Sequence, residues 1–367
     1  MVIKKLLLLL FITLGVLHSS DTQLPNDEEL HKLIGRMLLV GFPNETIDKN
    51  SEIVRQIKQY NLGGVILFDR FYSDRTKTKN ISSPNQLQHL TSKLKLYSNK
   101  PLLISIDQEG GKVARLKPAY GFANIPSAKR VSSLHVDKAK AIYNAQARML
   151  KSSGINCDFA PVVDLAVNEE NSVIYGLERS YGSNPQEVVK YASIFMDSLE
   201  NTEILSVLKH FPGHGSSLGD SHKGFVDITN TWTKKELEPY HYLINQGKVK
   251  MIMTAHVFNS NLDENHPATL SHFVNTTLLR ENLGYKGVVI SDDLQMKAIS
   301  EHYTISESVA LAINAGVDIL LFGNQLAEQD IDELVLLIAT EVKNGIIPIE
   351  RILESNRRIE LLHTQEN

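Results

Sequence analysis

The 367-residue chain contains a single cysteine, Cys157, so no disulfide bond can form within it. It carries a net charge of −4 and has no long run of charges of one sign. Because a nucleic-acid-binding protein shows a basic stripe, we expect no nucleic-acid partner. No HExxH pattern or comparable set of metal ligands occurs, which counts against a metal or another cofactor. With 42% hydrophobic residues, the chain can bury a core that needs no disulfide.

The apolar run at the N-terminus is too short to span a membrane comfortably. Two lysines precede the mostly apolar residues 6–17, and two small serines follow. This is the layout of a secretory signal peptide. We therefore expect residues 1–20 to be a signal peptide, residues 21–367 to be the folded domain, and the protein to be exported to the periplasm or secreted. An uncleaved leader that anchors the protein in the membrane is the alternative.

The rest of the chain alternates short apolar runs with longer amphipathic stretches, a pattern typical of a parallel sheet covered by helices. Eight candidate strands predict an α/β fold, a single-domain (β/α)8 TIM-type barrel, with a doubly wound open sheet as the alternative. The predicted strands are 37–42, 64–68, 102–106, 156–163, 204–208, 251–255, 287–290 and 318–322. The predicted helices are 85–97, 137–153, 185–199, 234–246, 271–282, 305–315, 331–343 and 348–363.

Polar side chains follow several of these strands directly. Asp107, His256 and Asp292 each come at such a strand end, and Lys209 and His210 follow another strand. In barrels of this kind the carboxyl ends of the strands surround the active site. A single polar side chain at a strand end can result from packing alone. Polar side chains at four equivalent strand ends indicate one shared pocket.

The segment 106–116, IDQEGGKVARL, begins where a predicted strand ends. Its two adjacent glycines allow a tight backbone turn, so Arg115 can return to Asp107 at the barrel mouth. A carboxylate and a guanidinium suit charge-assisted hydrogen bonds to sugar hydroxyls. A structural ion pair between these two residues is the alternative.

The segment 291–296, SDDLQM, places two carboxylates after another predicted strand. We expect Asp292 to face the barrel mouth and Asp293 to cap the segment that follows. An aspartate at the mouth can bind a metal, act as a base or attack a substrate carbon. The residue pattern alone leaves these three roles open.

Residues 208–225, LKHFPGHGSSLGDSHKGF, are rich in histidine and glycine. Asp220 and His222 lie two positions apart, and a carboxylate that close can hold an imidazole in one tautomer and raise its basicity. The glycines would let the segment move over a bound substrate. The pattern therefore favours a proton-transfer residue, with a metal site formed by the histidines and Asp220 as the alternative.

Together these motifs resemble the β-N-acetylhexosaminidase branch of the family 3 glycoside hydrolases. The resemblance runs from about residue 33 to residue 362 and includes KHFPGHG, DSH, DQEGGKVARL, NCDFAPVVDLA, LERSYG, MTAHV and GYKGVVISDDLQM. It implies a (β/α)8 barrel that hydrolyses terminal N-acetylglucosamine without a metal. It implies Asp292 as the nucleophile and His222, oriented by Asp220, as the general acid/base. The sugar contacts that it implies are Asp107, Arg115, Arg179, Lys209 and His210.

The resemblance also implies retention of configuration through a covalent glycosyl-aspartate intermediate. The expected partner is an oligosaccharide that contains N-acetylglucosamine, from peptidoglycan or chitin, and we expect a monomer. The alternatives are a family 3 β-glucosidase, a β-N-acetylglucosaminide phosphorylase and a non-catalytic sugar-binding protein. β-Glucosidases of the family usually take an acid/base glutamate from a second domain, for which this chain has no room. A neutral imidazole repels phosphate less than a carboxylate would, which keeps the phosphorylase open. The presence of both Asp292 and His222 counts against a non-catalytic protein.

Overall fold

The computed structural model describes residues 24–363, and its central sheet has eight strands. Every neighbouring pair of strands in this sheet is parallel. The strands are β1 (Leu38–Gly41), β2 (Gly64–Ile66), β3 (Leu103–Ile106), β6 (Cys157–Asp158), β7 (Leu205–Phe211), β8 (Met251–Thr254), β9 (Val288–Ile290) and β10 (Leu320–Phe322).

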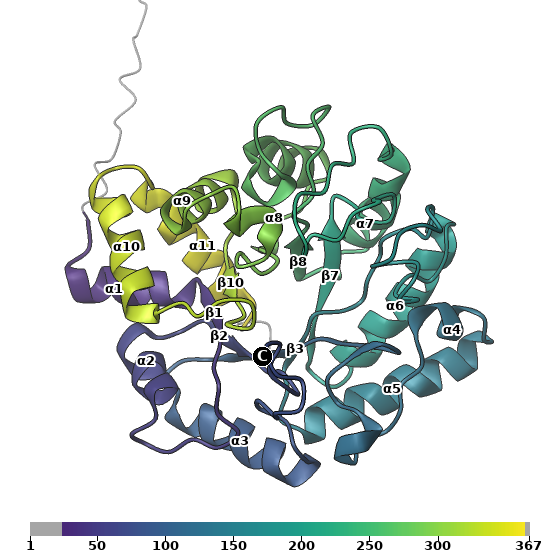
Figure 1. Cartoon of the computed structure of the whole chain (residues 1–367), viewed down its shortest axis with the longest axis horizontal. Helices are drawn as coiled ribbons and strands as arrows, with labels where there is room; N and C mark the ends of the chain where they lie inside the picture. Colours follow the sequence, from purple (N-terminus) through teal and green to yellow (C-terminus); the bar gives the residue numbers. More distant parts are fainter. Residues whose placement is uncertain (1–23, 364–367) are drawn as a thin grey trace, which may run out of the picture.

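The sheet closes on itself. Its hydrogen-bonded order is β10-β1-β2-β3-β6-β7-β8-β9, which leaves β9 and β10 at the two ends. A parallel bridge joins Ile290 to Ile319, and the N–H of Ser291 donates to the carbonyl oxygen of Ile319 (3.0 Å). Figure 1 shows the strands gathered at the centre with helices around them. The predicted (β/α)8 TIM-type barrel is confirmed, and the open doubly wound sheet is wrong.

All eight predicted helices are present, and their starts show why they form. Ser83 caps α3 and Asn184 caps α6, each followed by proline at the first helical position. Thr304 and Glu307 form a capping box at the start of α9. The sequence analysis missed α1, α2, α4 and α8. The helices are α1 (Asp27–Arg36), α2 (Glu52–Tyr60), α3 (Pro84–Tyr97), α4 (Ala128–Ser132), α5 (Val136–Ser152), α6 (Pro185–Glu200), α7 (Glu238–Asn245), η4 (Phe273–Asn282), α8 (Lys297–Ser300), α9 (Ile305–Ala315), α10 (Ile331–Lys343) and α11 (Ile349–Leu361).

Two strands differ from their predicted extents by more than two residues at one end. The strand predicted at 156–163 is regular only over β6, because Pro161 has no N–H to donate to a neighbouring strand. The strand predicted at 204–208 continues to Phe211 as β7, so Lys209 and His210 lie on the strand and not after it. The apolar run ends at Leu208, but the strand goes on because barrel side chains near the mouth need not be apolar.

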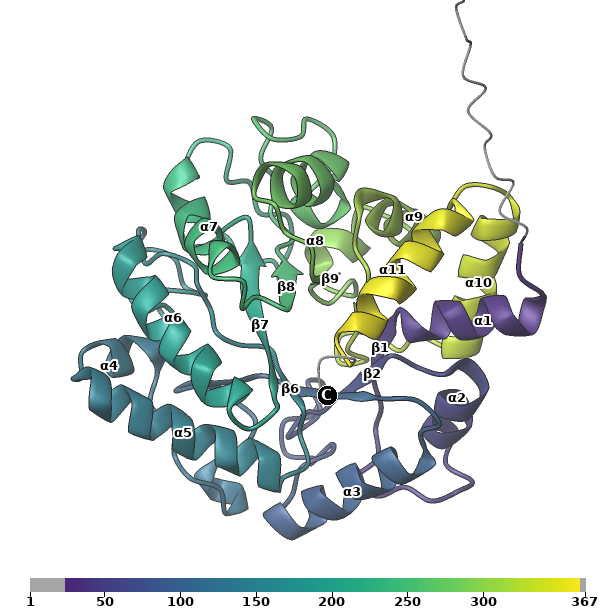
Figure 2. The ribbon, with the colours of Figure 1, turned by 180° about the vertical axis from the view of Figure 1, so that it is seen from behind.

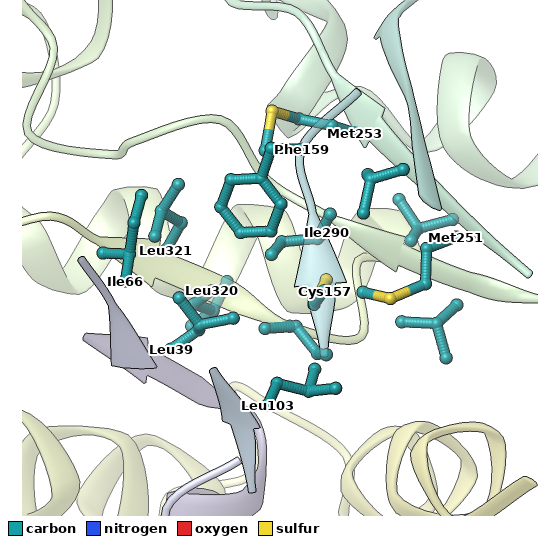
Figure 3. Close-up of a cluster of buried hydrophobic side chains, with 14 of the residues drawn as sticks. Leu39, Ile66, Leu103, Cys157, Phe159, Met251, Met253, Ile290, Leu320 and Leu321 are labelled. Atoms are coloured by element: carbon teal, nitrogen blue, oxygen red, sulfur yellow. The ribbon is translucent and has the colours of Figure 1, made fainter. Parts of the chain in front are cut away.

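The interior of the barrel is filled by side chains from nearly every strand. Leu39, Leu103, Cys157, Met251 and Ile290 come from five different strands and are fully buried. Figure 3 shows them packed together below Phe159 and Met253, which lie toward one end of the cluster. This close-packed interior makes the barrel a rigid frame and leaves space for a ligand only at its end.

The first and last helices of the described chain lie side by side. In Figures 1 and 2, α1 lies against α10 and α11. The side-chain amide of Asn356 in α11 donates to the carbonyl oxygen of Leu33 in α1 (2.9 Å).

Within residues 24–363, none of the helices has both the length and the apolar character to cross a membrane. The expected signal peptide, residues 1–20, lies outside the described residues.

Candidate active site

A cavity of about 570 Å³ opens at the carboxyl ends of the strands. It contains residues from the end of β3, from β7, from the loop after β7 and from the end of β9. Eight of the residues that the sequence singled out line it: Asp107, Arg115, Arg179, Lys209, His210, Asp220, His222 and Asp292. Residues up to 185 positions apart in the sequence therefore meet in one place, which is what the strand-end pattern predicted.

One wall of the cavity is a network of alternating charges. The Nζ atom of Lys209 lies 2.9 Å from Asp107 Oδ1 and 2.7 Å from Glu109 Oε1. Arg115 Nη2 binds the other oxygen of Asp107 (3.0 Å), as predicted. Arg179 binds Glu109 through Nε and Nη2, both at 2.7 Å. Bidentate pairs of this kind fix the planes of both groups, so the wall is rigid before a ligand arrives.

These groups are charged at neutral pH. Burial alone would raise the pKa of Asp107, but Lys209 and Arg115 outweigh it and hold that pKa well below its usual range. Burial would lower the pKa of Lys209, but Asp107 and Glu109 outweigh it and the pKa is raised. A buried cation and its buried carboxylates thus keep one another ionised.

The sequence analysis missed Glu109, which joins Lys209 to Arg179. It lies on β4 (Gln108–Gly110), which pairs with β5 (Val113–Ala114) in a hairpin. Two glycines at positive φ make the turn of this hairpin, as predicted. The signal for Glu109 was its place two residues after Asp107, which puts both carboxylates on the same side of an extended chain.

The imidazole of His210 lies between the guanidinium of Arg179 and the carboxylate of Asp164. Its Nε2 atom lies 3.2 Å from Arg179 Nη2, and because a guanidinium only donates, Nε2 must accept. The proton is therefore on Nδ1, which donates to Asp164 Oδ2 (2.7 Å). Asp164 Oδ1 also accepts the backbone N–H groups of His210 (3.2 Å) and His214 (2.9 Å).

Asp164 is a second residue that the sequence analysis missed. It is 1% exposed and fixes both the imidazole of His210 and the backbone that leaves β7. It follows the apolar run 156–163 directly, the same signal that drew attention to Asp107 and Asp292. This pattern was visible in the sequence. However, the predicted strand 156–163 is regular only over β6, so the sequence did not show where it ends.

Asp292 and Asp293 have different environments although they are adjacent. Asp292 Oδ1 accepts the N–H of Asp293 (2.8 Å). Burial would raise the pKa of Asp292, but three histidines led by His256 outweigh it and lower the pKa, so this residue is an ionised carboxylate. Burial raises the pKa of Asp293 to about 7. Asp293 Oδ1 accepts the N–H of Gln295 (3.1 Å), so this side chain caps the turn before α8, as predicted.

His256 was expected to share the pocket, and this expectation was wrong. It is 1% exposed, and the residues that line the cavity do not include it. Its Nε2 atom donates to the carbonyl oxygen of Asp293 (2.9 Å), and its Nδ1 atom pairs with Thr269 Oγ1 (2.8 Å). Both ring nitrogens thus have hydrogen-bond partners within the protein. Through the carbonyl group of Asp293, His256 fixes the backbone next to Asp292.

His222 and Asp220 form the pair that their spacing predicted. Nδ1 of His222 lies 3.0 Å from Asp220 Oδ1, and the same oxygen accepts the backbone N–H of His222 (3.0 Å). The side chain of His222 is 48% exposed, whereas Asp292 is partly buried. Burial would lower the pKa of His222, but the hydrogen bond to Asp220 and the charge of Asp292 outweigh it and raise the pKa. The imidazole can therefore hold a proton near neutral pH.

The three histidines of residues 208–225 do not converge on a common point for a metal. Nε2 of His210 faces the cation of Arg179, and Nδ1 of His214 pairs with Ser217 Oγ (2.8 Å). Within the described part of the chain, no three His, Cys, Asp or Glu side chains lie close enough together to hold a metal ion. A guanidinium next to His210 also repels a cation.

Comparisons with known proteins agree with this geometry. The family model for the glycosyl hydrolase family 3 N terminal domain matches residues 29–362. The beta-hexosaminidase of Tolumonas auensis is 37% identical over 280 residues, which are 74% of this chain and 78% of that protein. Beta-hexosaminidase LpqI of Mycobacterium tuberculosis is 34% identical over 268 residues, 71% of this chain and 67% of that protein.

A solved structure shows the same relationship. The family 3 beta-N-acetylglucosaminidase from Paenibacillus sp. matches with a TM-score of 0.82 and 31% identity. The match covers 91% of this chain but 62% of that one, so this chain spans less than two thirds of the Paenibacillus protein. The chain belongs to glycosyl hydrolase family 3.

Proposed function

We propose that this protein is a retaining β-N-acetylhexosaminidase, which releases terminal β-linked N-acetylglucosamine from the non-reducing end of an oligosaccharide. One observation carries the proposal: the partly buried, ionised Asp292 and the half-exposed, protonatable His222 line the same cavity. Relatives named beta-hexosaminidase and beta-N-acetylglucosaminidase support the choice of sugar.

The reaction takes two steps on this arrangement. In the first, the Asp292 carboxylate attacks C1 of the sugar, the glycosidic C–O bond breaks, and His222 gives its proton to the departing oxygen. A glycosyl ester of Asp292 forms. In the second, neutral His222 takes a proton from water while the water oxygen attacks C1 and the Asp292 carboxylate departs. Two inversions at C1 retain the configuration. Asp220 holds the imidazole so that Nε2 is the atom that transfers the proton.

The charged wall of the cavity would bind the sugar itself. The carboxylate of Asp107 accepts hydrogen bonds from sugar hydroxyls, and Lys209 and Arg115 donate them. Arg179 and His210 form the neighbouring part of the wall. Because these side chains already hold one another, they lose little conformational freedom when the sugar arrives.

The outer rim of the cavity carries an excess of positive charge. Four cations line it: Arg70, which is half-buried, and Arg75, Lys112 and Lys223, which are exposed. Arg75 lies over the ring of Tyr72, 5.5 Å from its centre. The leaving group of the substrate would lie on this rim. Chitin oligosaccharides are neutral, whereas the other sugar of peptidoglycan carries a carboxylate. The rim therefore favours peptidoglycan fragments as substrates, and we include this choice in the proposal.

The rim gives a testable prediction. The double substitution Arg70→Gln and Arg75→Gln is expected to lower kcat/KM for a muropeptide about 3- to 10-fold at low salt, because two exposed charge contacts are each worth about 0.2–1 kcal/mol. Turnover of chitobiose should not change. The loss on the muropeptide should shrink as salt is added. Lys77→Gln, on the same loop but outside the cavity, is the control. Equal losses on both substrates would contradict a charge-specific rim.

EDTA is expected to leave turnover unchanged. The histidines near the cavity are engaged by Arg179, Ser217 and Asp220, so proton transfer and hydrogen bonding account for their places. The measurement compares initial rates before and after prolonged chelation. Loss of activity that added zinc restores would support the metal site that the histidine-rich segment left open.

Product analysis tests the proposed function as a whole. The protein is incubated with chitobiose and with muropeptides, with and without inorganic phosphate, and the first sugar product is followed by NMR. We expect free N-acetylglucosamine in its β form and no dependence on phosphate. A sugar phosphate would establish phosphorolysis instead, and the α anomer would establish inversion.

Export and a monomeric state stay predictions, to be tested by cell fractionation and by light scattering.

A further inference from the structure

The segment 232–240 packs against the start of the acid/base loop. We define this loop as residues 212–225. The indole N–H of Trp232 donates to the carbonyl oxygen of Pro212 (3.1 Å). The ring of Tyr240 packs edge-to-face against Phe211, with 5.1 Å between ring centres. These two contacts thus fix the chain at the point where β7 ends and the acid/base loop begins.

Glu236 is at the centre of this contact. It lies in the short helix η2 (Lys234–Leu237) and is 2% exposed. Its Oε2 atom accepts the N–H of Gly215 (2.9 Å). A Cβ atom on Gly213 would lie 2.7 Å from the same oxygen, and Gly213 has a φ of +124°. The loop can therefore turn this close to the carboxyl group only because residue 213 is glycine.

The charge state of Glu236 is unusual for a glutamate. Its Oε1 atom has no hydrogen-bond partner among residues 24–363. The groups that face it are the Asp164 carboxylate, the Tyr240 hydroxyl from α7 and the loop residues Gly215 and Ser216. Burial raises the pKa of Glu236 to about 7, and the negative charge of Asp164 adds to this effect. Near neutral pH the group thus changes between an uncharged acid and a buried anion that lacks a cation.

We propose that Glu236 is a positioning residue of the reaction: it holds the turn at Gly213–Gly215, and this turn sets where the acid/base loop places His222. The proposal rests on the assignment of His222 as the general acid/base. Asp164, which faces Glu236, accepts the backbone N–H of His214 within the same turn. The neutral acid holds the turn without repelling Asp164. The anion repels it and loosens the turn.

Single substitutions test the contact. Glu236→Ala removes it and is expected to lower kcat on chitobiose by about 10²-fold, the order of loss that a displacement of about 1 Å produces. KM should change little, because the sugar-binding wall is untouched. Glu236→Gln keeps an acceptor oxygen and should retain most of the wild-type kcat at pH 6. Glu238→Gln, two positions along the chain, is the matched control and should behave as wild type.

The double variant Glu236→Ala/His222→Ala separates positioning from general destabilisation. If Glu236 acts through His222, the double variant loses no more activity on chitobiose than His222→Ala alone. Losses that multiply would overturn the proposal, as would a Glu236→Ala variant that changes KM and not kcat. Release of N-acetylglucosamine by the wild type tests the proposed function separately.

Thermal unfolding provides a readout that needs no turnover. The folded-state pKa of Glu236, about 7, lies above the ordinary value of 4.5. The folded protein therefore keeps a proton that the unfolded chain has lost between these two values. The stability from this group is complete below pH 4.5 and is lost as the pH rises through 7. The Tm of Glu236→Gln should consequently fall less than that of the wild type between pH 5 and pH 8. Parallel Tm curves for the two proteins would contradict the ionisation of Glu236.

Discussion

Asp292→Asn is expected to reduce turnover by about 10⁴- to 10⁶-fold, where the upper figure is the order of loss that removal of the nucleophile causes in a serine hydrolase. The reason is that a neutral amide cannot form the glycosyl ester through which a retaining enzyme acts. The fold should survive, since asparagine has nearly the same shape and can still accept the N–H of Asp293. Circular dichroism and Tm check this point.

Asp293→Asn is the matched control for this result. Burial raises the pKa of Asp293 to about 7, so much of this residue is already neutral near that pH and asparagine imitates it. We expect this variant to keep most of its turnover. A 2-fluoro sugar that traps the covalent intermediate should label the peptide at Asp292. Label on Asp293 or Asp107 would assign the attack to a different carboxylate.

Much of this site could be predicted because its signals are local in the sequence. Asp107 and Asp292 each follow an apolar run, and the place of a strand end can be read from the run itself. Asp220 and His222 are two residues apart, so their contact needs no knowledge of the fold. The barrel follows from the number and spacing of the apolar runs.

The residues that escaped prediction act through partners distant in the sequence. Glu109 has a role only because β7 brings Lys209 beside it, a contact across 100 positions. Glu236 meets the acid/base loop only after the chain has turned back beneath it. The end of β7 was misplaced for the same reason. Lys209 ends the apolar run, but its charge is buried against Asp107 and Glu109, so the strand continues.

His222→Ala gives the second large effect, and its size should depend on the leaving group. A sugar alcohol is basic and needs a proton as it departs, whereas nitrophenolate hardly does. General acid catalysis contributes about 10²- to 10⁴-fold, so we expect a loss of that order on chitobiose. The glycosylation step of a nitrophenyl glycoside should lose clearly less. Asp220→Ala should show the same pattern more mildly, because it removes only the group that orients and charges the imidazole.

The pH profile and chemical rescue distinguish proton transfer at His222 from sugar binding. The hydrogen bond to Asp220 and the charge of Asp292 raise the pKa of His222 against the effect of burial, so the acid form is present up to neutral pH and is lost as the pH rises. The wild-type basic limb on chitobiose should therefore disappear in His222→Ala. Azide should rescue the second step on the nitrophenyl substrate, since it attacks C1 without needing a base. Equal losses on both substrates, or a change in KM alone, would mean that His222 binds the sugar and that another group on the rim is the acid.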